Sequence, residues 1–306
     1  MKKILITGCN GQLGKTLTKE FSNKTKRKNG QYKIIFKSKK DFDITNKKKC
    51  EDFIYKENPD WVINAAAYTN VDMAEKEKDL AYAVNSLGPE FISNALLKTG
   101  GKLIHISTDY VFSGEQSFPY KTDSERKPIN IYGKTKVEGE IAIESILIPQ
   151  KRAKIIRTSW LIGHVGKNFL TKIINLLKNK ASLNIVDDQI SSPTTTKSLS
   201  EACYKMIIDD NSLSNDQSIF HWSDSGVASW YDLTKYICKI CLNKGLLKSS
   251  CKIEPISSKN FPTLAIRPKF SKLDCKSTQE YLQLKNNYWQ ESIEDEIEKI
   301  RSSLDN

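Results

Sequence analysis

Short apolar runs rich in β-branched residues recur along the first half of the chain, and longer amphipathic stretches separate them. The runs are typical of strands buried on both faces of a parallel sheet; they are Lys3–Thr7, Tyr32–Phe36, Trp61–Asn64, Lys102–Ile106 and Lys154–Arg157. The stretches between them repeat their apolar residues at helical spacing; they are Lys15–Phe21, a helix from a Thr45 N-cap to Lys56, Leu80–Leu97 with Asp72 as a candidate cap before it, and the segment around Tyr132. This alternation predicts an α/β fold with a doubly wound parallel sheet.

The regular alternation weakens after Trp160. Helical spacing remains in four segments, which are Phe169–Leu177, Ser198–Ile208, Trp230–Leu242 and Trp289–Leu304. Two further strands are predicted, at Leu183–Val186 and Ile219–Trp222, and the segment between Pro255 and Asp274 is rich in loop-forming residues. We therefore expect the second half to add strands to the sheet near residues 183–222 and to form a smaller lobe beside it.

A glycine-rich turn, Gly8-Cys-Asn-Gly-Gln-Leu-Gly14, lies between the first predicted strand and the first predicted helix. The spacing alone is a weak signal. In this position the glycines permit a tight turn and bring the backbone close to a pyrophosphate at the helix N-terminus. The turn therefore predicts a Rossmann-type dinucleotide-binding domain over residues 1–160. Residues 161–306 are then a mixed region that contains the smaller, mainly C-terminal, substrate-binding lobe.

The end of the second predicted strand indicates which dinucleotide is bound. An acidic residue there would accept a hydrogen bond from the ribose 2′-hydroxyl of NAD. This chain has Lys37-Ser-Lys-Lys40 instead, and lysines suit the 2′-phosphate of NADP. Because lysines are frequent throughout the chain, the pattern favours NADPH and leaves NADH open.

Tyr132 and Lys136 are four residues apart, so on a helix their side chains lie one turn apart on the same face. An ammonium beside a phenol favours the phenolate, and the pair is then a poised proton donor. The same spacing also arises by chance in lysine-rich helices. Thr108 follows the fourth predicted strand, at the sheet edge where open α/β sheets bind ligands, and offers a hydroxyl to a carbonyl oxygen. His105 lies within that strand, and we interpret it as structural.

Charge is spread along the chain and is not gathered on one element. The chain has 306 residues, of which 39% are hydrophobic and 27% charged, and its net charge is +12. A nucleic-acid-binding protein would concentrate basic and aromatic residues on one face. The densest basic zone holds eleven Lys and Arg between Lys24 and Lys49. We interpret it as solvated surface, part of which could bind an anionic ligand, and we expect no nucleic-acid partner.

The cysteines and the apolar runs predict a cytoplasmic protein. Seven cysteines, an odd number, are scattered along the chain and imply no disulfide framework. The pair Cys238 and Cys241 falls inside a predicted helix without a second pair or paired histidines, so we expect no metal site. Ile4–Ile6 is too short for a signal-peptide core, and no run approaches the ~18 apolar residues of a membrane span.

Taken together, these motifs resemble those of the extended short-chain dehydrogenase/reductases, and within them the dTDP-4-dehydrorhamnose reductases. The likeness spans nearly the whole chain. It is carried by Gly8–Gly14, Asp43-Ile44, Asn64–Ala67, Val71-Asp72, Ala74-Glu75, Ser107–Phe112, Tyr132-Gly-x-x-Lys136 with Glu140, Arg157–Trp160, Asp188-Gln189, Pro193-Thr194 and Arg267-Pro268. The glycine turn and Tyr-x-x-x-Lys are common to the superfamily. Ser-Thr-Asp-Tyr-Val-Phe and Arg-Thr-Ser-Trp are more specific to this group.

The resemblance implies a role for each matching residue. Cofactor contacts are implied for Gly8, Asn10, Gly11, Gln12, Leu13, Gly14, Lys39, Asp43, Ile44, Ala65, Ala66, Ala67, Tyr132 and Lys136. Substrate contacts are implied for Thr108, Tyr110, Tyr132 and Trp160. In the implied reaction a hydride passes from the nicotinamide to the C4 ketone of the nucleotide sugar. Thr108 and Tyr132 hydrogen-bond the resulting alkoxide, Tyr132 protonates it, and Lys136 holds the nicotinamide ribose.

Two departures from related patterns limit what is carried over. Nucleotide-sugar 4,6-dehydratases place an Asp-Glu pair after the threonine, whereas this chain has Asp109 followed by Tyr110, which favours simple ketone reduction. Some reductases carry an acidic residue after the glycine turn that helps to hold Mg²⁺ at a dimer contact. This chain has Lys15 there, which argues against a metal-bridged dimer and leaves another homodimer open.

Two alternatives remain at this point. Another nucleotide-deoxysugar 4-ketoreductase would show the same motifs, and no residue separates the two activities. The regulatory subunit of methionine adenosyltransferase resembles this fold and binds NADP without catalysing a reduction. It has no need of a proton donor, whereas Thr108, Tyr132 and Lys136 are all present here.

Overall fold

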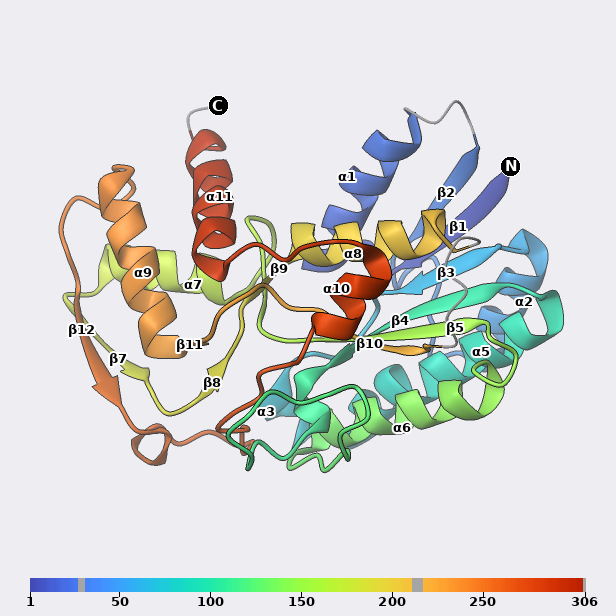
Figure 1. Cartoon of the computed structure of the whole chain (residues 1–306), viewed down its shortest axis with the longest axis horizontal. Helices are drawn as coiled ribbons and strands as arrows, with labels where there is room; N and C mark the ends of the chain where they lie inside the picture. The colour runs from blue at the N-terminus through green and yellow to red at the C-terminus, as the bar shows by residue number, and fades with distance from the viewer. Residues whose placement is uncertain (27–30, 211–216, 305–306) are drawn as a thin grey trace.

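A central parallel sheet of six strands organises the first part of the molecule (Figure 1). The structure is a computed structural model that describes residues 1–26, 31–210 and 217–304, so Arg27 and Lys28 of the basic zone lie outside the described residues. The strand order is β10-β5-β4-β3-β1-β2. The strands are β1 (Lys2–Thr7), β2 (Tyr32–Lys37), β3 (Trp61–Asn64), β4 (Lys102–Thr108), β5 (Ala153–Thr158) and β10 (Ile219–His221). The doubly wound α/β sheet is confirmed, and every neighbouring pair is parallel.

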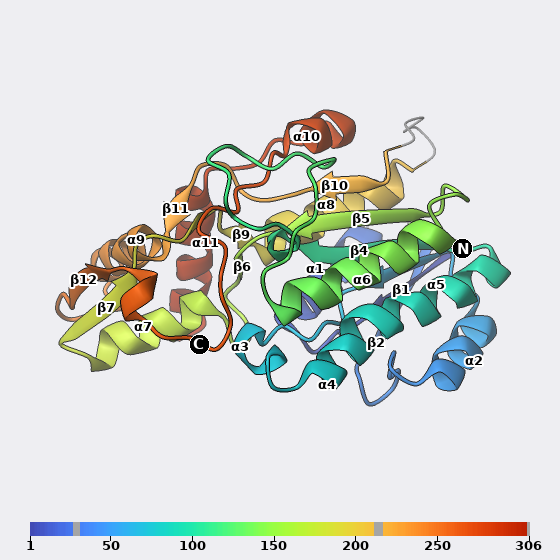
Figure 2. The same cartoon turned by 90° about the horizontal axis from the view of Figure 1, so that it is seen from below.

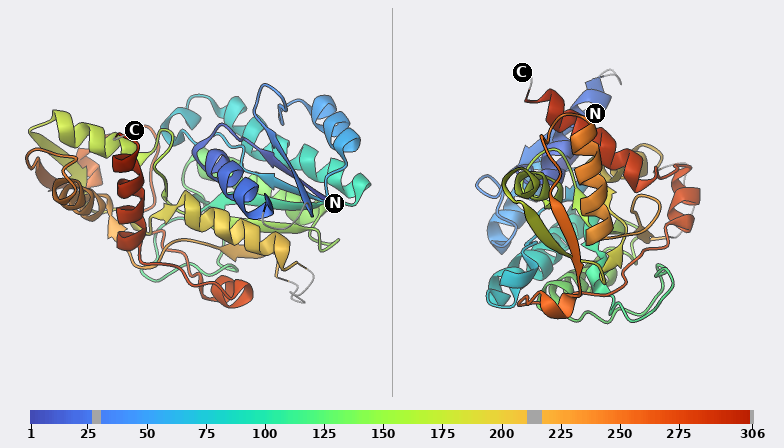
Figure 3. Two further views of the ribbon diagram at one scale, coloured as in Figure 1. Left: turned by 90° about the horizontal axis from the view of Figure 1, so that it is seen from above. Right: turned by 90° about the vertical axis from the view of Figure 1, so that its left-hand side faces the viewer.

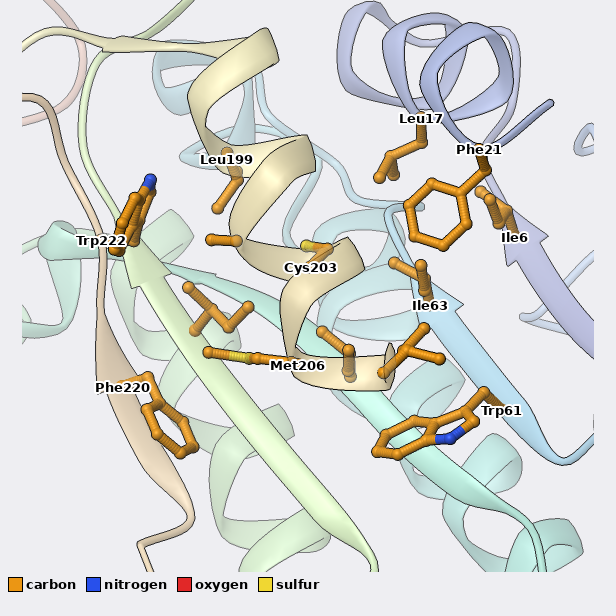
Figure 4. Close-up of a cluster of buried hydrophobic side chains, with 14 of the residues drawn as sticks. Ile6, Leu17, Phe21, Trp61, Ile63, Leu199, Cys203, Met206, Phe220 and Trp222 are labelled. Atoms are coloured by element: carbon orange, nitrogen blue, oxygen red, sulfur yellow. The ribbon is translucent and has the colours of Figure 1, made fainter. Parts of the chain in front are cut away.

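Helices cover both faces of this sheet, as the views from above and below show (Figures 2 and 3). Helices α1 (Gln12–Lys26) and α8 (Thr196–Ile208) lie on one face, and α2 (Lys47–Glu57), α5 (Gly88–Thr99) and α6 (Ile131–Ile146) lie on the other. Because strand side chains alternate, neighbours in sequence enter different cores. Ile6 and Ile63 pack with α1 and α8 in the cluster of Figure 4. Leu5 and Val62 pack on the opposite side with α2 and α5.

A smaller lobe of C-terminal segments lies beside the sheet, at the left of Figure 1. It contains α7 (Phe169–Asn179), β7 (Ser182–Val186), α9 (Trp230–Asn243), β12 (Lys252–Ile256) and α11 (Trp289–Ser302) around a separate core. The prediction that β7 joins the main sheet is wrong, because β7 pairs in parallel with β12. Its side chains are mostly exposed or half-buried, as expected for one strand of a small sheet with a solvated face. Of the described strands after β5, only β10 joins the main sheet.

Short elements inside the connections escaped prediction because their length gives no periodic signal. They are β6 (Leu161–Ile162), β8 (Ile190–Ser191), β9 (Thr194–Thr195), β11 (Ala228–Ser229), the 3₁₀ turns Asp109–Val111 and Ser258–Asn260, and α10 (Lys276–Leu282). Within the described residues, no helix combines the length and the apolar character that a membrane crossing requires.

Two predicted caps are displaced. Asn46 caps α2 in place of Thr45, whose hydroxyl instead donates to Asp43. Asp72 does not cap the helix predicted after it: it lies inside α3 (Val71–Ala74), which Asn70 caps, and its carboxylate accepts from Arg267. In both cases a nearby asparagine accepts the hydrogen bond from the third backbone amide of the helix, which a capping side chain must reach.

The predicted helix Leu80–Leu97 is interrupted. It consists of α4 (Lys78–Tyr82), a π-helical turn (Ala83–Leu87) and α5. Pro89 at the start of α5 has no backbone amide to donate to the preceding turn. The buried Asn85 side chain in the π turn accepts a hydrogen bond from the Tyr68 amide and donates one to the Tyr68 carbonyl. A π turn of this kind often marks a functional region.

The π turn also sets how closely α6 can approach. A Cβ atom added at Gly139 of α6 would overlap the carbonyl oxygen of Asn85. Glycine is therefore required here by close packing of two backbones, and it costs some helix propensity.

We expect Gly139→Ala to lower the free energy of unfolding by about 1–3 kcal/mol, because overpacking outweighs the gain in helix propensity. Urea denaturation followed by circular dichroism would measure it. The exposed Ser145→Ala in the same helix is the matched control and should change stability by less than about 0.5 kcal/mol. A stabilised Gly139→Ala would show that α6 does not depend on this close contact.

Candidate active site

The first turn of α6 is fixed from three directions. The Asn130 side chain accepts a hydrogen bond from the Gly133 amide at 2.8 Å and donates to the Ile266 carbonyl at 2.8 Å. The Glu75 carboxylate accepts from the Ile131 amide at 2.9 Å. Negative charge at a helix N-terminus is favourable. These contacts hold the backbone that carries Tyr132.

Tyr132, Lys136 and Glu140 form one stripe of α6, each one turn from the next. Lys136 is buried, and its Nζ donates to the Ile106 carbonyl at 2.7 Å and lies 3.1 Å from His105 Nε2. Burial lowers the pKa of Lys136 to about 8. The stripe therefore faces β4. It places Lys136, an ammonium with a lowered pKa, one helical turn from the Tyr132 phenol.

Glu140 anchors the stripe to the sheet. Its carboxylate is fully buried and accepts from the Arg157 guanidinium of β5 at 2.7 Å, from Arg126 at 3.1 Å and from the Ser107 hydroxyl of β4. Burial alone would raise the pKa of Glu140, yet the two arginines and the serine hold it below its usual value. A buried carboxylate with this many donors stays charged and fixes α6 against β4 and β5.

Tyr132 lies in an aromatic and hydroxyl-bearing corner. Its ring meets the Tyr110 ring edge-on, with centroids 5.7 Å apart. Burial raises the pKa of Tyr132 to about 12, and the interaction with the Thr108 hydroxyl opposes this shift. Our expectation that Lys136 makes Tyr132 more acidic is therefore wrong for this structure, because desolvation of the phenolate dominates. Tyr132 keeps its proton at neutral pH.

The glycine turn forms a backbone cradle between β1 and α1. Gly8 has a φ of 64°, in the left-handed region, and the Gly11 amide donates to its carbonyl at 2.9 Å. An added Cβ at Gly8 would lie 2.8 Å from the Ala66 amide nitrogen, and one at Gly14 would overlap the Gly8 carbonyl. The first turn of α1 carries no acidic residue. The cradle and the positive helix end together fit a pyrophosphate.

The other expected cofactor residues occupy three settings. Ala65, Ala66 and Ala67 follow β3 directly, and the Ala66 amide donates to Thr7 Oγ1 at 3.2 Å. Asp43 accepts from the amide and hydroxyl of Thr45, and Ile44 is buried in the core beside α2 and α5. Asn10 is exposed, Leu13 is buried, and Gln12 donates from Nε2 to the Leu161 carbonyl at 3.1 Å.

The lysines after β2 point to different surroundings. Lys37 lies over the Phe53 ring at 5.3 Å, so its side chain is already engaged. Lys39 and Lys40 are exposed. Between them and Lys37, Ser38 donates its hydroxyl to Asp41 at 2.6 Å, which closes the turn. Lys39 and Lys40 are therefore accessible to an anionic ligand.

Trp160 at the end of β5 joins the main sheet to the lobe. Its φ is 42°, a left-handed conformation that costs a bulky residue roughly 1–3 kcal/mol. Its ring stacks on Trp230 of α9, with centroids 3.5 Å apart. Trp230 in turn donates from Nε1 to Gln189 at 3.1 Å. Such strain persists only where surrounding packing imposes it, and it is typical of binding sites.

Comparison with known proteins identifies the family. The model of the RmlD substrate binding domain matches residues 1–302. The chain belongs to the RmlD substrate binding domain family. It is 35% identical to the spore coat polysaccharide biosynthesis protein SpsK of Bacillus subtilis, over 100% of both chains. It is 34% identical to the dTDP-4-dehydrorhamnose reductase of Aggregatibacter actinomycetemcomitans, over 96% of this chain and 97% of that one.

A solved structure shows the same architecture. The dTDP-4-dehydrorhamnose reductase of Bacillus anthracis, crystallised in complex with NADP, superposes with a TM-score of 0.88 at 35% identity, over 98% of this chain and 100% of that chain. The resemblance seen in the motifs is confirmed over almost the full length of this RmlD-family chain. The glycine cradle described above is consistent with a dinucleotide ligand.

Sequence reasoning missed part of the site of this RmlD-family chain. His105 lies buried in β4 as predicted, but its contact with Lys136 was not foreseen. Trp230 carried no motif, although an aromatic at the start of a predicted amphipathic helix was a usable signal.

Lys15, which replaces the acidic residue that some reductases carry after the glycine turn, is exposed in α1. Within the described ranges, no three His, Cys, Asp or Glu side chains gather closely enough to hold a metal ion.

Asp109 is a buried carboxylate beside Thr108. It accepts from the Ser271 hydroxyl at 2.5 Å and from the Thr108 hydroxyl at 3.1 Å. No cation is among its partners in the described part of the chain, and burial raises its pKa to about 7. The native state therefore holds a proton on Asp109 between about pH 4 and 7, where the unfolded chain has released it.

We expect this carboxyl to make the protein less stable as pH rises. The raised pKa gives stability that is fully present below about pH 4 and is lost as pH rises to about 7. Asp109→Asn does not titrate, so its stability relative to the parent should increase by roughly 1.4 kcal/mol per pH unit across that window and level off above it. Urea unfolding at several pH values would measure the difference. A difference independent of pH would mean that Asp109 ionises normally.

Proposed function

We propose that this chain reduces the C4 ketone of dTDP-4-dehydro-L-rhamnose to give dTDP-L-rhamnose, with NADPH as the reductant. The observation that carries the proposal is the convergence of Thr108, Tyr132 and Lys136 beside the glycine cradle, at the carboxyl ends of β1, β3 and β4. Family membership and the named reductases among its relatives support the same activity.

The residues of the first half would hold the cofactor. The cradle of Gly8, Gly11 and Gly14 would present backbone amides to the pyrophosphate, and Lys39 and Lys40 would bind the 2′-phosphate. Bound NADPH supplies the hydride that reduces the ketone. Lys136, which contacts His105 and the Ile106 carbonyl of β4, would offer its remaining donor to the nicotinamide ribose.

Tyr132 serves as the general acid. Its raised pKa keeps the phenol protonated until a much stronger base, the sugar alkoxide, appears beside it. The Thr108 hydroxyl and the Tyr132 hydroxyl together hydrogen-bond the oxygen on which charge develops, as preorganised donors do in an oxyanion hole. The charge on Lys136 stabilises the phenolate left after the transfer. The chain therefore supplies position, a proton and charge stabilisation.

The substrate would lie between the main sheet and the lobe. Residues 1–160 form the dinucleotide-binding part, and residues 161–306 contain the lobe around α7, α9 and α11. Tyr110 follows β4 and Trp160 follows β5, at the carboxyl ends of these strands, and we propose that they contact the sugar. All seven cysteines are free, which supports a reducing compartment such as the cytoplasm as the place of action.

The deciding assay follows NADPH oxidation with enzymatically prepared dTDP-4-dehydrorhamnose. The pure protein should turn over this substrate, and Tyr132→Phe should reduce turnover by about 10²–10⁴-fold while leaving NADPH affinity nearly unchanged, because only the proton is lost. The exposed Tyr82→Phe on α4 is the matched control and should keep full activity.

The other activities predict different results. A different deoxysugar ketoreductase would turn over another nucleotide 4-ketosugar faster. A regulatory subunit resembling that of methionine adenosyltransferase would bind NADPH without oxidising it with any ketosugar. Full turnover by Tyr132→Phe would place the proton donor elsewhere.

Cofactor choice can be tested at the lysines after β2. The double change Lys39→Ala and Lys40→Ala should weaken NADPH binding by roughly 10-fold, and NADH binding by less than about 2-fold, because only NADPH carries the 2′-phosphate. Fluorescence titration would measure both. The matched control removes two exposed lysines of the lobe, Lys239 and Lys248, and should leave both affinities unchanged. Equal losses for the two nucleotides would contradict recognition of the phosphate.

A further inference from the structure

Three polar side chains lie in one row across the main sheet. In the strand registers, Thr7 of β1 is opposite Asn64 of β3, and Asn64 is opposite His105 of β4. Two residues earlier in each strand stand Leu5, Val62 and Leu103, which are buried beneath α2 and α5. By strand alternation the polar row shares that face. All three polar residues are almost completely buried.

Hydrogen bonds connect this row from the cofactor cradle to α6. The Ala66 amide donates to Thr7 Oγ1 at 3.2 Å, and Thr7 Oγ1 donates to Asn64 Oδ1 at 2.7 Å. Asn64 Nδ2 lies 3.2 Å from His105 Nδ1, and His105 Nε2 lies 3.1 Å from Lys136 Nζ. Both ring nitrogens of His105 are therefore engaged, one by an amide and the other by an amine.

The protonation states along this row depend on one another. Burial and the neighbouring lysine charge hold the pKa of His105 well below its usual value, so the ring is neutral and has one donor and one acceptor nitrogen. If Nδ1 accepts from Asn64 Nδ2, then Nε2–H must face a neutral amine. If the Asn64 amide is turned so that Oδ1 accepts from Nδ1–H and Nδ2 instead donates to Thr7 Oγ1, then Nε2 accepts from the Lys136 ammonium. The second arrangement provides the acceptor that a charged lysine needs.

No carboxylate provides that acceptor. Among the described residues, the polar partners of Lys136 Nζ are His105 and the Ile106 carbonyl. Glu140, one turn further along α6, is engaged by Arg157 and Arg126. A buried ammonium without an ion-pair partner depends strongly on each hydrogen bond that it makes.

We propose that His105, oriented by Asn64, is a positioning residue that accepts a hydrogen bond from Lys136 and so keeps this lysine charged and aligned for the Tyr132 proton transfer. The proposal rests on the proposed reductase activity for its kinetic consequence, and on the buried row alone for its structural one.

Other ionisable groups also face this corner. From the elements packed against α6 they are Asp109 and Tyr110 after β4, Glu75 after α3, Arg157 on β5, and on α6 itself Tyr132 and Glu140. The pKa values in this corner are about 7 for Asp109, about 8 for Lys136 and about 12 for Tyr132. Loss of activity as pH rises through 8 therefore reports the lysine and not the phenol.

The kinetic test uses three variants and the pH profile of kcat/KM. In His105→Phe the ammonium loses its acceptor, so the Lys136 pKa falls and the alkaline limb should move to lower pH by about one unit. His105→Gln returns an acceptor oxygen near the Nε2 position and should restore the limb. His221→Phe is the matched control, because His221 is equally buried but contacts Arg157 and the Tyr120 carbonyl. An unmoved limb in His105→Phe, or an equal shift in His221→Phe, would overturn the proposal.

A spectroscopic test needs no turnover and no variant of His105. The chain has three histidines, so imidazole ¹⁵N spectra hold three sets of signals. The His105 signals should stay those of a neutral ring from about pH 6 to 10 and should change once, with the midpoint of Lys136. This change should vanish in Lys136→Met. Signals that titrate near 6.5, or a change that persists in Lys136→Met, would overturn the proposal, whereas absent turnover would count only against the proposed reaction.

Discussion

The buried pairing of Glu140 with Arg157 is the constraint on which the rest of the site depends. Arg157 reaches from β5 and Ser107 from β4, while Glu140 belongs to α6, so one carboxylate ties the helix to two adjacent strands. Tyr132 and Lys136 lie on the same stripe of α6, so the contacts of Glu140 also fix their positions. Breaking such a pair from one side leaves an uncompensated charge, at a cost of about 3–5 kcal/mol. The position of Tyr132 is thus set by the buried residues Glu140, Arg157 and Ser107.

Close packing supports this electrostatic clamp. Gly139 sits beside Glu140 and lets α6 approach the π turn at Asn85 without a side chain between them. The Asn85 amide donates to Thr135 at 3.1 Å, so the same turn that needs the glycine also bonds the helix. The close approach of Gly139 to Asn85 therefore holds α6 against the π turn, and the buried pair of Glu140 and Arg157 holds it against the sheet. Neither contact alone would fix the rotation of α6 about its axis.

The sequence was sufficient for the parts that rest on local physics. Apolar runs, glycine spacing and the four-residue step from Tyr132 to Lys136 are all readable along one segment, and the six-stranded sheet and family confirm them. Features that depend on how neighbouring strands are aligned could not be predicted from the sequence. In sequence, His105 looks like an ordinary strand residue. The register of β3 and β4 brings it to Asn64, and the packing of α6 on the sheet brings it to Lys136. The partner of β7 was predicted wrongly for the same reason. The sequence of a five-residue strand does not indicate that it pairs with β12 and not with the main sheet.

The remaining difference concerns charge, which a sequence shows only as residue type. From spacing alone a lysine beside a tyrosine should make the phenol more acidic, yet burial moves the two pKa values toward the neutral forms, up for Tyr132 and down for Lys136. The opposed shifts suit a reductase. A phenol that holds its proton tightly gives it only to a base as strong as an alkoxide, and an ammonium that is costly to bury gains most when a phenolate forms beside it. Lys136 thus bears its desolvation penalty before the reaction, and the transfer forms the phenolate beside a positive charge that is already in place.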